Sequence, residues 1–297
     1  MKPQQHIDPT RWLSDLSDDL PICDINIPGS HNAAAINMKR PTRWTCQCHS
    51  ITEQLEKGIR LLDIRLKPKH LNTNYTFTTC HGHLGPFGAN EFQPLDEVLE
   101  ECTNFLSANP GETIIMTIQI DDWRRTRPKD HPQINQALKA TLTNHPLLRT
   151  PNMARLKDCR GRIYLINRIN DDPVLGVPIN IPDNTSGTTL EPTAQRHYEV
   201  YIQDQYKRLN KRRPEAHKLR LTVEAFENKH KGAMLLNFAS GTKPFGRFVY
   251  IMEDLSQYFA RQHPKQIGWI LLDYPFNTSP QSPTDLPTLI IASNYHS

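Results

Sequence analysis

The 297-residue chain lacks any long apolar run, and no window approaches the roughly 18 consecutive apolar residues that a membrane-spanning helix requires. Its first residues, MKPQQHIDPTRWLSDL, also lack the apolar core of a secretory signal. We therefore expect any membrane contact to be peripheral. The chain is expected to be cytosolic, exported by a route that needs no such signal, or already processed.

The chain also has few cysteines and a small net charge. Six cysteines are too few for a disulfide scaffold at this length. Cys46 and Cys48 beside His49 resemble a metal cluster only faintly, because no second pair at ligand spacing accompanies them, so reduced structural thiols are expected. The net charge of +4 is mild, and the main basic cluster is 207–213. This cluster is most simply a solvated helix face, with a phosphate or lipid-headgroup patch as the alternative; no nucleic-acid partner is expected.

The chain does contain short apolar runs rich in β-branched residues, which are typical of buried strands. Helical patterns over 92–107 and 247–262 separate some of them. Alternating strands and helices predict parallel pairing, and eight such strands predict a closed barrel. The runs are 24–31, 58–66, 75–81, 112–120, 162–168, 200–206, 233–239 and 267–274.

The predicted barrel is irregular, because the stretch 170–195 is loop-like and has no helical period. We therefore expect an α/β fold, a distorted TIM barrel with eight mainly parallel strands and some helices missing. No shift in composition marks a domain boundary. Residues 1–297 are accordingly predicted to form one catalytic domain, with 1–21 as an N-terminal helical extension.

Polar side chains stand at or near the carboxyl ends of most of these runs. In a parallel barrel those ends share one rim, where the active site lies. The set is rich in cationic and acid/base groups, and it lacks the cluster of carboxylates that would hold a divalent metal. Its members are His31, Asp63, Arg65, His81, Gln119, Arg168, Asp204, Tyr206 and Asp273.

Two histidines and an arginine suit the cleavage of a phosphodiester without a metal ion. That reaction needs a base for the nucleophile, a cation for the charge that develops on the phosphorus oxygens, and an acid for the leaving oxygen. Histidine can be base or acid near neutral pH, and arginine can bind two phosphate oxygens at once. His31, His81 and Arg65 fill these three roles.

An ordered set of segments resembles the bacterial phosphatidylinositol-specific phospholipases C. The segments are IPGSHN, GIRLLDIRL, CHGH, NPGETIIM, VYIQDQYK and GWILLDY, and the resemblance runs from about Ile22 to the end of the chain. It implies a distorted TIM barrel that cleaves phosphatidylinositol to diacylglycerol and a 1,2-cyclic inositol phosphate. The nucleophile in that reaction is the 2-hydroxyl of the inositol ring.

The same resemblance implies roles for individual residues. His31 corresponds to the general base, and Asp273 to the carboxylate that orients it. Arg65 corresponds to the phosphate-binding cation, and His81 to the general acid toward the diacylglycerol oxygen. Three further residues correspond to the inositol pocket: Arg168, Asp204 and Tyr206.

Some positions depart from the bacterial pattern. The bacterial enzymes have an aspartate at the position of Asn32. The calcium-dependent eukaryotic phospholipases C have asparagine there, as this chain does, and the segment CHGH is also closer to the eukaryotic form. Those eukaryotic enzymes, however, have acidic residues at the positions of Arg65 and Gln119. Because a guanidinium supplies positive charge and repels a cation, we predict catalysis without a metal or any other cofactor.

These departures have consequences inside the site. Without the aspartate at position 32, His81 needs another orienting partner, for which Asp63 is our hypothesis. Gln119 is neutral where the bacterial pocket has a lysine, which alters the binding of the headgroup.

Two aromatic residues are candidates for contact with a lipid surface. Trp44 falls where the bacterial enzymes have an exposed tryptophan, and Phe245 lies in the corresponding rim loop. Aromatic rings flanked by Arg and Lys suit an interfacial anchor. The alternative for Trp44 is packing inside the protein. We expect a monomer whose partner is a membrane surface containing phosphatidylinositol.

Two other function classes stay open at this point. A glycerophosphodiester phosphodiesterase is also a barrel with two catalytic histidines, but its HRG start and metal-binding glutamates are missing around His31. A non-catalytic inositol-lipid binding module would have lost an acid/base residue, whereas His31, His81, Arg65 and Asp273 are all present.

Overall fold

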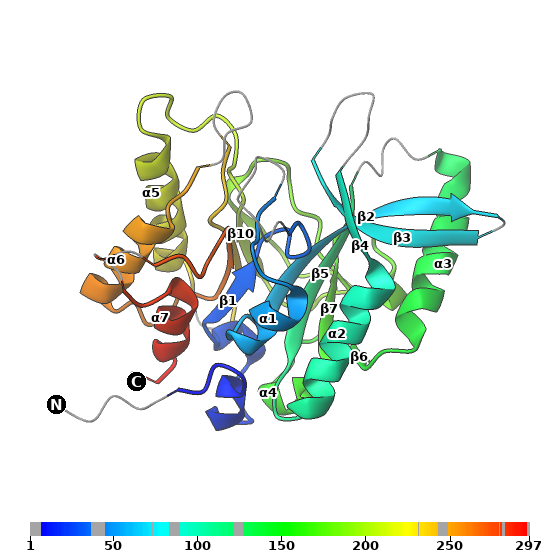
Figure 1. Ribbon diagram of the computed structural model, residues 1–297, viewed down its shortest axis with the longest axis horizontal. Coiled ribbons are helices and arrows are strands. Elements are labelled where there is room, and N and C mark those ends of the chain that lie inside the picture. Colours follow the sequence, from blue (N-terminus) through cyan, green and yellow to red (C-terminus); the bar gives the residue numbers. More distant parts are fainter. Residues whose placement is uncertain are drawn as a thin grey trace.

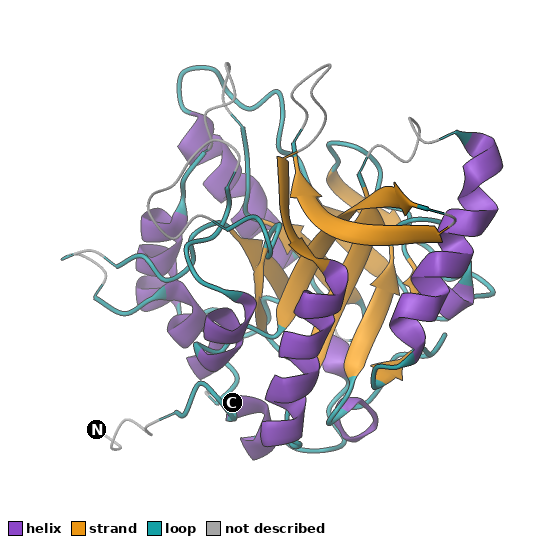
Figure 2. Cartoon of the chain, turned by 45° about the vertical axis from the view of Figure 1, so that its right-hand side comes forward, coloured by secondary structure: helices purple, strands orange, loops and turns teal. Residues whose placement is uncertain are grey.

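The computed structural model describes residues 7–36, 45–72, 74–82, 90–121, 127–230, 232–242, 249–278, 280 and 283–295. A continuous sheet runs through the middle of the molecule, and helices lie outside it on both sides (Figures 1 and 2). The strands are β1 Ile27–Ser30, β2 Leu61–Leu71, β3 Asn74–His81, β4 Asn90–Pro94, β5 Ile114–Ile120, β6 Leu147–Leu148, β7 Ile163–Asn167, β8 Val177–Pro178, β9 Ser186–Leu190, β10 Val200–Gln203, β11 Met234–Phe238 and β12 Trp269–Leu272.

The α-helices are α1 Ile51–Glu56, α2 Leu95–Ala108, α3 His131–Thr143, α4 Leu156–Cys159, α5 Pro214–Glu227, α6 Met252–Gln262 and α7 Leu286–Ala292. Short 3-10 helices are η1 Trp12–Asp15, η2 Ile22–Asp24, η5 Pro128–Asp130 and η6 Pro173–Leu175. The helical pattern predicted over 92–107 corresponds to α2, and the pattern over 247–262 to α6, which begins at Met252. Within the described residues, no helix is both long and apolar enough to cross a membrane.

Parallel pairing dominates the sheet, as predicted. The chain of parallel neighbours is β8, β7, β5, β2, β1, β12, β11 and β10. Among the described residues no ladder joins β8 to β10, because β8 has two residues and the edge of β10 is taken by antiparallel β9. The fold is therefore a distorted barrel whose hydrogen bonding is interrupted between β8 and β10. The prediction of a barrel closed by hydrogen bonds all the way round was wrong at this point.

The run 75–81 is a strand, but its assignment to the parallel barrel was wrong. It forms β3, which pairs antiparallel with β2, with Leu71 opposite Asn74. Asn72, with φ of 55°, makes the tight turn between them, whereas a parallel connection needs a dozen or more residues. The hairpin extends beside α3 (Figure 1). The remaining barrel strand is β8, which lies in the stretch predicted as loop.

Alternate residues of the barrel strands face two different apolar clusters. Leu61, Ile115 and Leu271 belong to a cluster inside the barrel that also holds Trp12 and Trp269. Their sequence neighbours pack outward, against α1, α2 and α3 on one side or against α5, α6 and α7 on the other. Because the side chains of a strand alternate with period two, each strand carries one inward-facing set.

The amino-terminal segment closes the end of the barrel opposite the carboxyl ends of the strands. In its described part, 7–21, it contains the 3-10 helix η1, from which Trp12 donates its indole N–H to the carbonyl of Gly58 at 3.0 Å. The buried Arg60 guanidinium donates to Glu112 at 2.8 Å and to the carbonyls of Pro9 and Thr10. These bonds fasten the segment to the starts of β2 and β5.

Candidate active site

One cavity of about 250 Å³ opens at the carboxyl ends of the barrel strands. The predicted convergence of polar side chains on one rim is confirmed, since eight of the nine residues named from the strand ends line this cavity. They are His31, Arg65, His81, Gln119, Arg168, Asp204, Tyr206 and Asp273. The ninth, Asp63, is fully buried and bonds to two of the lining residues.

The period of two explains why these side chains point inward. Asp63 and Arg65 continue the inward-facing series of Leu61 on β2, and Asp273 continues that of Leu271 on β12. The same rule places Arg168 two residues after the inward-facing Ile166. Each series therefore changes from apolar to polar toward the carboxyl end of its strand, so the apolar core becomes the floor of the cavity.

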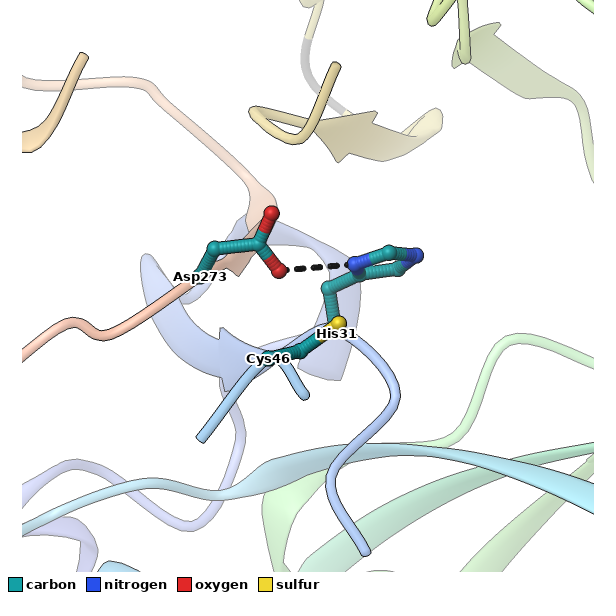
Figure 3. A group of neighbouring side chains, drawn as sticks. All are labelled: His31, Cys46 and Asp273. Atoms are coloured by element: carbon teal, nitrogen blue, oxygen red, sulfur yellow. Dashed lines mark hydrogen bonds and ion pairs between the residues drawn. The ribbon is translucent and has the colours of Figure 1, made fainter. Parts of the chain in front are cut away.

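Strand order brings the acid/base pair together. β1 and β12 are parallel neighbours, with Ser30 opposite Leu272, so His31 and Asp273 follow side by side. His31 Nδ1 lies 2.8 Å from Asp273 Oδ1 (Figure 3). The other ring nitrogen, Nε2, faces two donors, Arg65 Nη2 at 3.1 Å and Asn32 Nδ2 at 3.0 Å. Both require a lone pair on Nε2, so the network assigns the proton to Nδ1, where Asp273 accepts it.

Asp63 is the hub of the cationic part of the site. Its Oδ1 accepts from Arg168 Nη1 at 2.9 Å and from Thr117 Oγ1 at 2.8 Å. Its Oδ2 accepts from Arg65 Nε at 3.3 Å and from the backbone N–H of Asn32 at 3.2 Å. A carboxylate offers about four acceptor positions, so these four donors fill them.

The hypothesis that Asp63 orients His81 is therefore corrected: its acceptor positions serve the two guanidiniums instead. His81 Nδ1 lies 3.8 Å from Cys46 Sγ. The His81 ring stands nearly perpendicular to that of His31, at 81°, with 6.1 Å between the ring centroids. The two imidazoles thus flank the same part of the cavity, His31 after the end of β1 and His81 at the end of β3.

The charges of these buried groups shift their pKa values. Burial alone would raise the pKa of Asp63, but Arg65 and Arg168 outweigh it and hold that pKa well below its usual range. Burial likewise opposes the charge of Arg65, yet Asp63 and other carboxylates raise its pKa above the ordinary value. Asp63 and Arg65 are therefore both ionised throughout the physiological range.

The expected inositol-pocket residues surround the remainder of the cavity. Burial raises the pKa of Asp204, although Arg168 and Arg65 oppose this rise. The half-buried Tyr206 donates its hydroxyl to Asp183 at 2.7 Å. Within the described structure, Gln119 Oε1 and Arg168 Nε are buried without a hydrogen-bond partner. Such orphaned groups are costly unless a ligand or water satisfies them, which indicates that the cavity is built to bind a polar molecule.

The sequence prediction missed several residues that line the cavity: Thr45, Cys46, Ile181, Pro182, Asp183, Ser240, Gly241 and Thr242. Ser240 follows the inward-facing Phe238 by two positions, so the period-two rule applied to 233–239 could have found it. Cys46 carried no comparable signal, since its place depends on the fold of the 45–47 segment. Both residues proposed for lipid contact, Trp44 and Phe245, lie outside the described residues.

Comparison with known proteins agrees with this geometry. Residues 19–169 match the family Phosphatidylinositol-specific phospholipase C, X domain. The chain is 26% identical to the 1-phosphatidylinositol phosphodiesterase of Staphylococcus aureus over 312 residues, which cover 96% of this chain and 94% of the relative. Identity to the 1-phosphatidylinositol phosphodiesterase of Listeria monocytogenes is 35% over 167 residues, covering 53% of this chain and 48% of the relative.

Solved structures show the same fold. A phosphatidylinositol-specific phospholipase C from Staphylococcus aureus superposes with a TM-score of 0.78 at 22% identity, covering 97% of this chain and 98% of the other. The enzyme from Listeria monocytogenes gives a TM-score of 0.62 at 22% identity, covering 97% and 99%. The chain therefore belongs to the phosphatidylinositol-specific phospholipase C family and has the barrel fold of its bacterial members.

Proposed function

We propose that this protein cleaves phosphatidylinositol by intramolecular phosphotransfer, giving diacylglycerol and a 1,2-cyclic inositol phosphate, and that the reaction uses no metal ion. The observation that carries the proposal is the arrangement around His31. Asp273 holds Nδ1 at 2.8 Å, while Nε2 and the Arg65 guanidinium, 3.1 Å apart, face the same cavity. A base and a phosphate-binding cation are thus within reach of one substrate.

His31 is the general base in this proposal. Its Nε2 lone pair accepts the proton of the inositol 2-hydroxyl, which then attacks phosphorus. The resulting imidazolium is stabilised by the Asp273 carboxylate, which also keeps the ring in the tautomer that the reaction needs. Asp273 has a side chain only 7% exposed, so little water competes for this hydrogen bond.

Arg65 stabilises the charge that develops on the non-bridging oxygens. Its side chain is 19% exposed and its Nε is anchored on Asp63, which leaves the two terminal nitrogens to face the cavity. In the substrate-free site Nη2 donates to His31; a bound phosphate takes over this donor as a bidentate acceptor. His31 is thereby released to receive the proton of the substrate.

His81 is the general acid toward the diacylglycerol oxygen. It stands across from His31, with 6.1 Å between the ring centroids, so a phosphoryl group bound at Arg65 can contact both rings. The inositol ring then extends toward Arg168, Asp204 and Tyr206. The orphaned Gln119 Oε1 is an acceptor for a ring hydroxyl there.

The residues around Arg65 do not fit a catalytic calcium ion. Calcium takes six to eight oxygen ligands. The carboxylate nearest to Arg65, Asp63, already accepts four hydrogen bonds, two of them from guanidiniums. A cation at that position would also face the repulsion of Arg65 and Arg168, whose positive charges already neutralise the substrate phosphate.

The substrate is reached at a lipid surface. The segment between β10 and α5 follows the carboxyl end of β10, on the rim where the cavity opens, and it carries the exposed cations Lys207, Arg208, Lys211, Arg212 and Arg213. Thr242 lines both the catalytic cavity and a second hollow beside this segment. This favours the lipid-headgroup interpretation of the basic cluster, together with Trp44 and Phe245 as apolar anchors.

The test is an assay with phosphatidylinositol vesicles in the presence of a chelator, followed by phosphorus NMR. A cyclic phosphate is the expected product, and replacing His31 or His81 with alanine should lower the rate at least ~100-fold each. Product that appears only after calcium is restored would refute the metal-free mechanism. Near-normal rates in either alanine variant would refute the assignment of that histidine.

A further inference from the structure

A thiol lies directly beside the proposed base and its carboxylate. Ligand atoms of His31, Cys46 and Asp273 all fall within 4.8 Å of one another, and the side chains converge from different elements (Figure 3). This is a different grouping from the one considered in the sequence, because Cys48 is not part of it and the His49 ring packs on Phe276, with 4.9 Å between centroids. Cys46 and Asp273 are buried, and the His31 side chain is 12% exposed.

We propose that His31, Cys46 and Asp273 form an inhibitory binding site for a zinc-like divalent ion at the floor of the catalytic cavity. The ion is not part of turnover. It competes with catalysis by taking the ring nitrogen that Asp273 holds in the active enzyme. The consequence for turnover rests on the proposed function, whereas the binding of the ion does not.

The donor set selects the kind of ion. One thiolate, one imidazole and one carboxylate are typical ligands of zinc and of chemically similar transition metals, and three protein ligands leave a fourth position open. His81 Nδ1 lies 3.8 Å from Cys46 Sγ but is not part of the group, so a water molecule would take the fourth position. Calcium and magnesium prefer oxygen ligands, of which this group offers only one carboxylate, so neither should bind.

The distances are close to those of an assembled site. Zinc bonds of about 2.0–2.3 Å in a tetrahedron put neighbouring ligand atoms roughly 3.3–3.8 Å apart. His31 Nδ1 and Asp273 Oδ1 are at 2.8 Å and must separate slightly to admit the ion. All three residues line the cavity, so an ion can reach them from solvent.

The backbone fixes Cys46 where the site needs it. Its N–H donates to the carbonyl of Ala35 at 2.8 Å, and its own carbonyl accepts the N–H of Tyr274, the residue after Asp273, at 2.9 Å. Gln47 Nε2 donates to the carbonyls of His31 and Leu272, at 2.8 and 3.0 Å. The thiol is therefore tied to the same strand ends that carry His31 and Asp273, which lowers the entropic cost of assembling the site.

The guanidinium that opposes calcium does not oppose this ion to the same extent. Arg65 Nη2 contacts Nε2, on the other side of the imidazole from Nδ1. The ion brings two positive charges and the thiol loses one proton, so the net charge of the group rises from −1 to 0. The thiolate and the carboxylate together neutralise the ion, so no net positive charge faces Arg65.

Binding moves protons in a defined way. The Cys46 thiol loses its proton to solvent as the sulfur–metal bond forms, since the thiolate is the ligand. The ion replaces the proton on Nδ1 of His31, and the neutral ring then carries its proton on Nε2. Asn32 Oδ1, buried without a partner among the described residues, can accept that proton after a flip of its amide. Arg65 Nη2, which donates to Nε2 in the ion-free site, must turn away from the ring. A protonated Nε2 cannot act as the base, so turnover stops.

The experiment measures ion binding without lipid, by zinc calorimetry and by the charge-transfer absorption of a thiolate bound to Co²⁺. The unmodified protein is expected to bind one ion per chain, release about one proton and show the cobalt–thiolate band. Cys46→Ala should lose the band and at least tenfold in zinc affinity. The matched control is Cys48→Ala, two residues away and outside the group, which should keep both.

Inhibition is measured separately, as the zinc concentration that halves each variant's own rate in the cleavage assay. Cys46→Ala should need at least tenfold more zinc than the unmodified protein, chelator should restore the rate, and excess magnesium should have no effect. Equal zinc affinity in the two cysteine variants, or no zinc binding by a protein that cleaves phosphatidylinositol normally, would overturn this site. A protein that binds zinc through Cys46 but cleaves no phosphatidylinositol would instead refute the proposed function alone.

Discussion

Replacing Asp63 with asparagine should separate the positioning of the guanidiniums from the acid/base chemistry. The carboxylate is fully buried and accepts four hydrogen bonds, two on each oxygen. An amide oxygen at the Oδ1 position keeps the bonds from Thr117 and Arg168. The amide NH₂ then faces the donors Arg65 Nε and Asn32 N, so Arg65 loses its anchor.

The expected loss of stability is large, because the change leaves buried guanidiniums without their shared counter-charge. Removing one partner of a buried ion pair costs about 3–5 kcal/mol. Thr117→Val is the matched control: it removes one neutral hydrogen bond to the same carboxylate and should cost about 1 kcal/mol. Urea unfolding followed by tryptophan fluorescence measures both values, and kcat and KM on phosphatidylinositol are measured in parallel.

Acidity provides a second test of the same residue. Arg65 and Arg168 outweigh burial and lower the pKa of Asp63, so its ionised form stabilises the fold above the ordinary pKa of aspartate, about 3.9. This contribution is lost as the pH falls toward the lowered pKa of the folded state. The gap in unfolding free energy between the unmodified protein and Asp63→Asn should stay constant from about pH 7 to 5. Below about pH 4 it should narrow by roughly 1.4 kcal/mol per pH unit. A difference in unfolding free energy below about 0.5 kcal/mol at pH 7, or a difference that does not narrow below about pH 4, would refute the role of Asp63 as the shared counter-charge of Arg65 and Arg168.

Three other perturbations give distinct outcomes. Asp273→Asn removes the acceptor for the Nδ1 proton of His31 and should lower kcat at least ~100-fold while KM changes little; a raised KM with normal kcat would contradict this role. Burial lowers the pKa of Lys218 to about 7. The unmodified protein should therefore gain stability relative to Lys218→Met as the pH rises from 7 to 10, measured by urea unfolding. A stability difference that stays constant with pH would contradict this lowered pKa. Changing Arg208, Lys211, Arg212 and Arg213 together to glutamine should weaken sedimentation with anionic vesicles at least ~10-fold at low salt, and unchanged binding would remove the basic segment from the membrane contact.

Much of the fold could be predicted from the local sequence pattern. The errors in the prediction concern how the strands pair. All eight apolar runs contain strands, because short apolar segments rich in β-branched residues favour a strand over a helix. Whether a strand joins the barrel depends on its connection, and the turn at Asn72 places β3 in a hairpin. The two-residue strand β8 has no pattern long enough to detect. Strand existence is therefore a local property, while barrel membership is set by the whole topology.

The site was predictable to the extent that period two and strand ends determine it. His31, Arg65, Gln119 and Asp273 could be placed on one rim because each faces inward near the end of a parallel strand. Partner choice could not be predicted in the same way. Asp63 is shared with Arg168, 105 residues away, and the thiol of Cys46 reaches the site through backbone bonds of a segment with no repeating pattern.

Two of the departures that the resemblance implies, at positions 32 and 119, would compensate each other in charge. By that resemblance Asn32 stands in place of an aspartate and Gln119 in place of a lysine, so one negative and one positive charge would be absent together. Arg65 and Arg168 remain as the cations that line the cavity in the described structure. Arg168 is 7% exposed and bonded to Asp63, whereas Arg65 keeps its terminal nitrogens toward the cavity, so the charge of a bound phosphate rests mainly on Arg65. Because Asp63 anchors Arg65 Nε, we expect the binding of the phosphate to depend on this buried carboxylate.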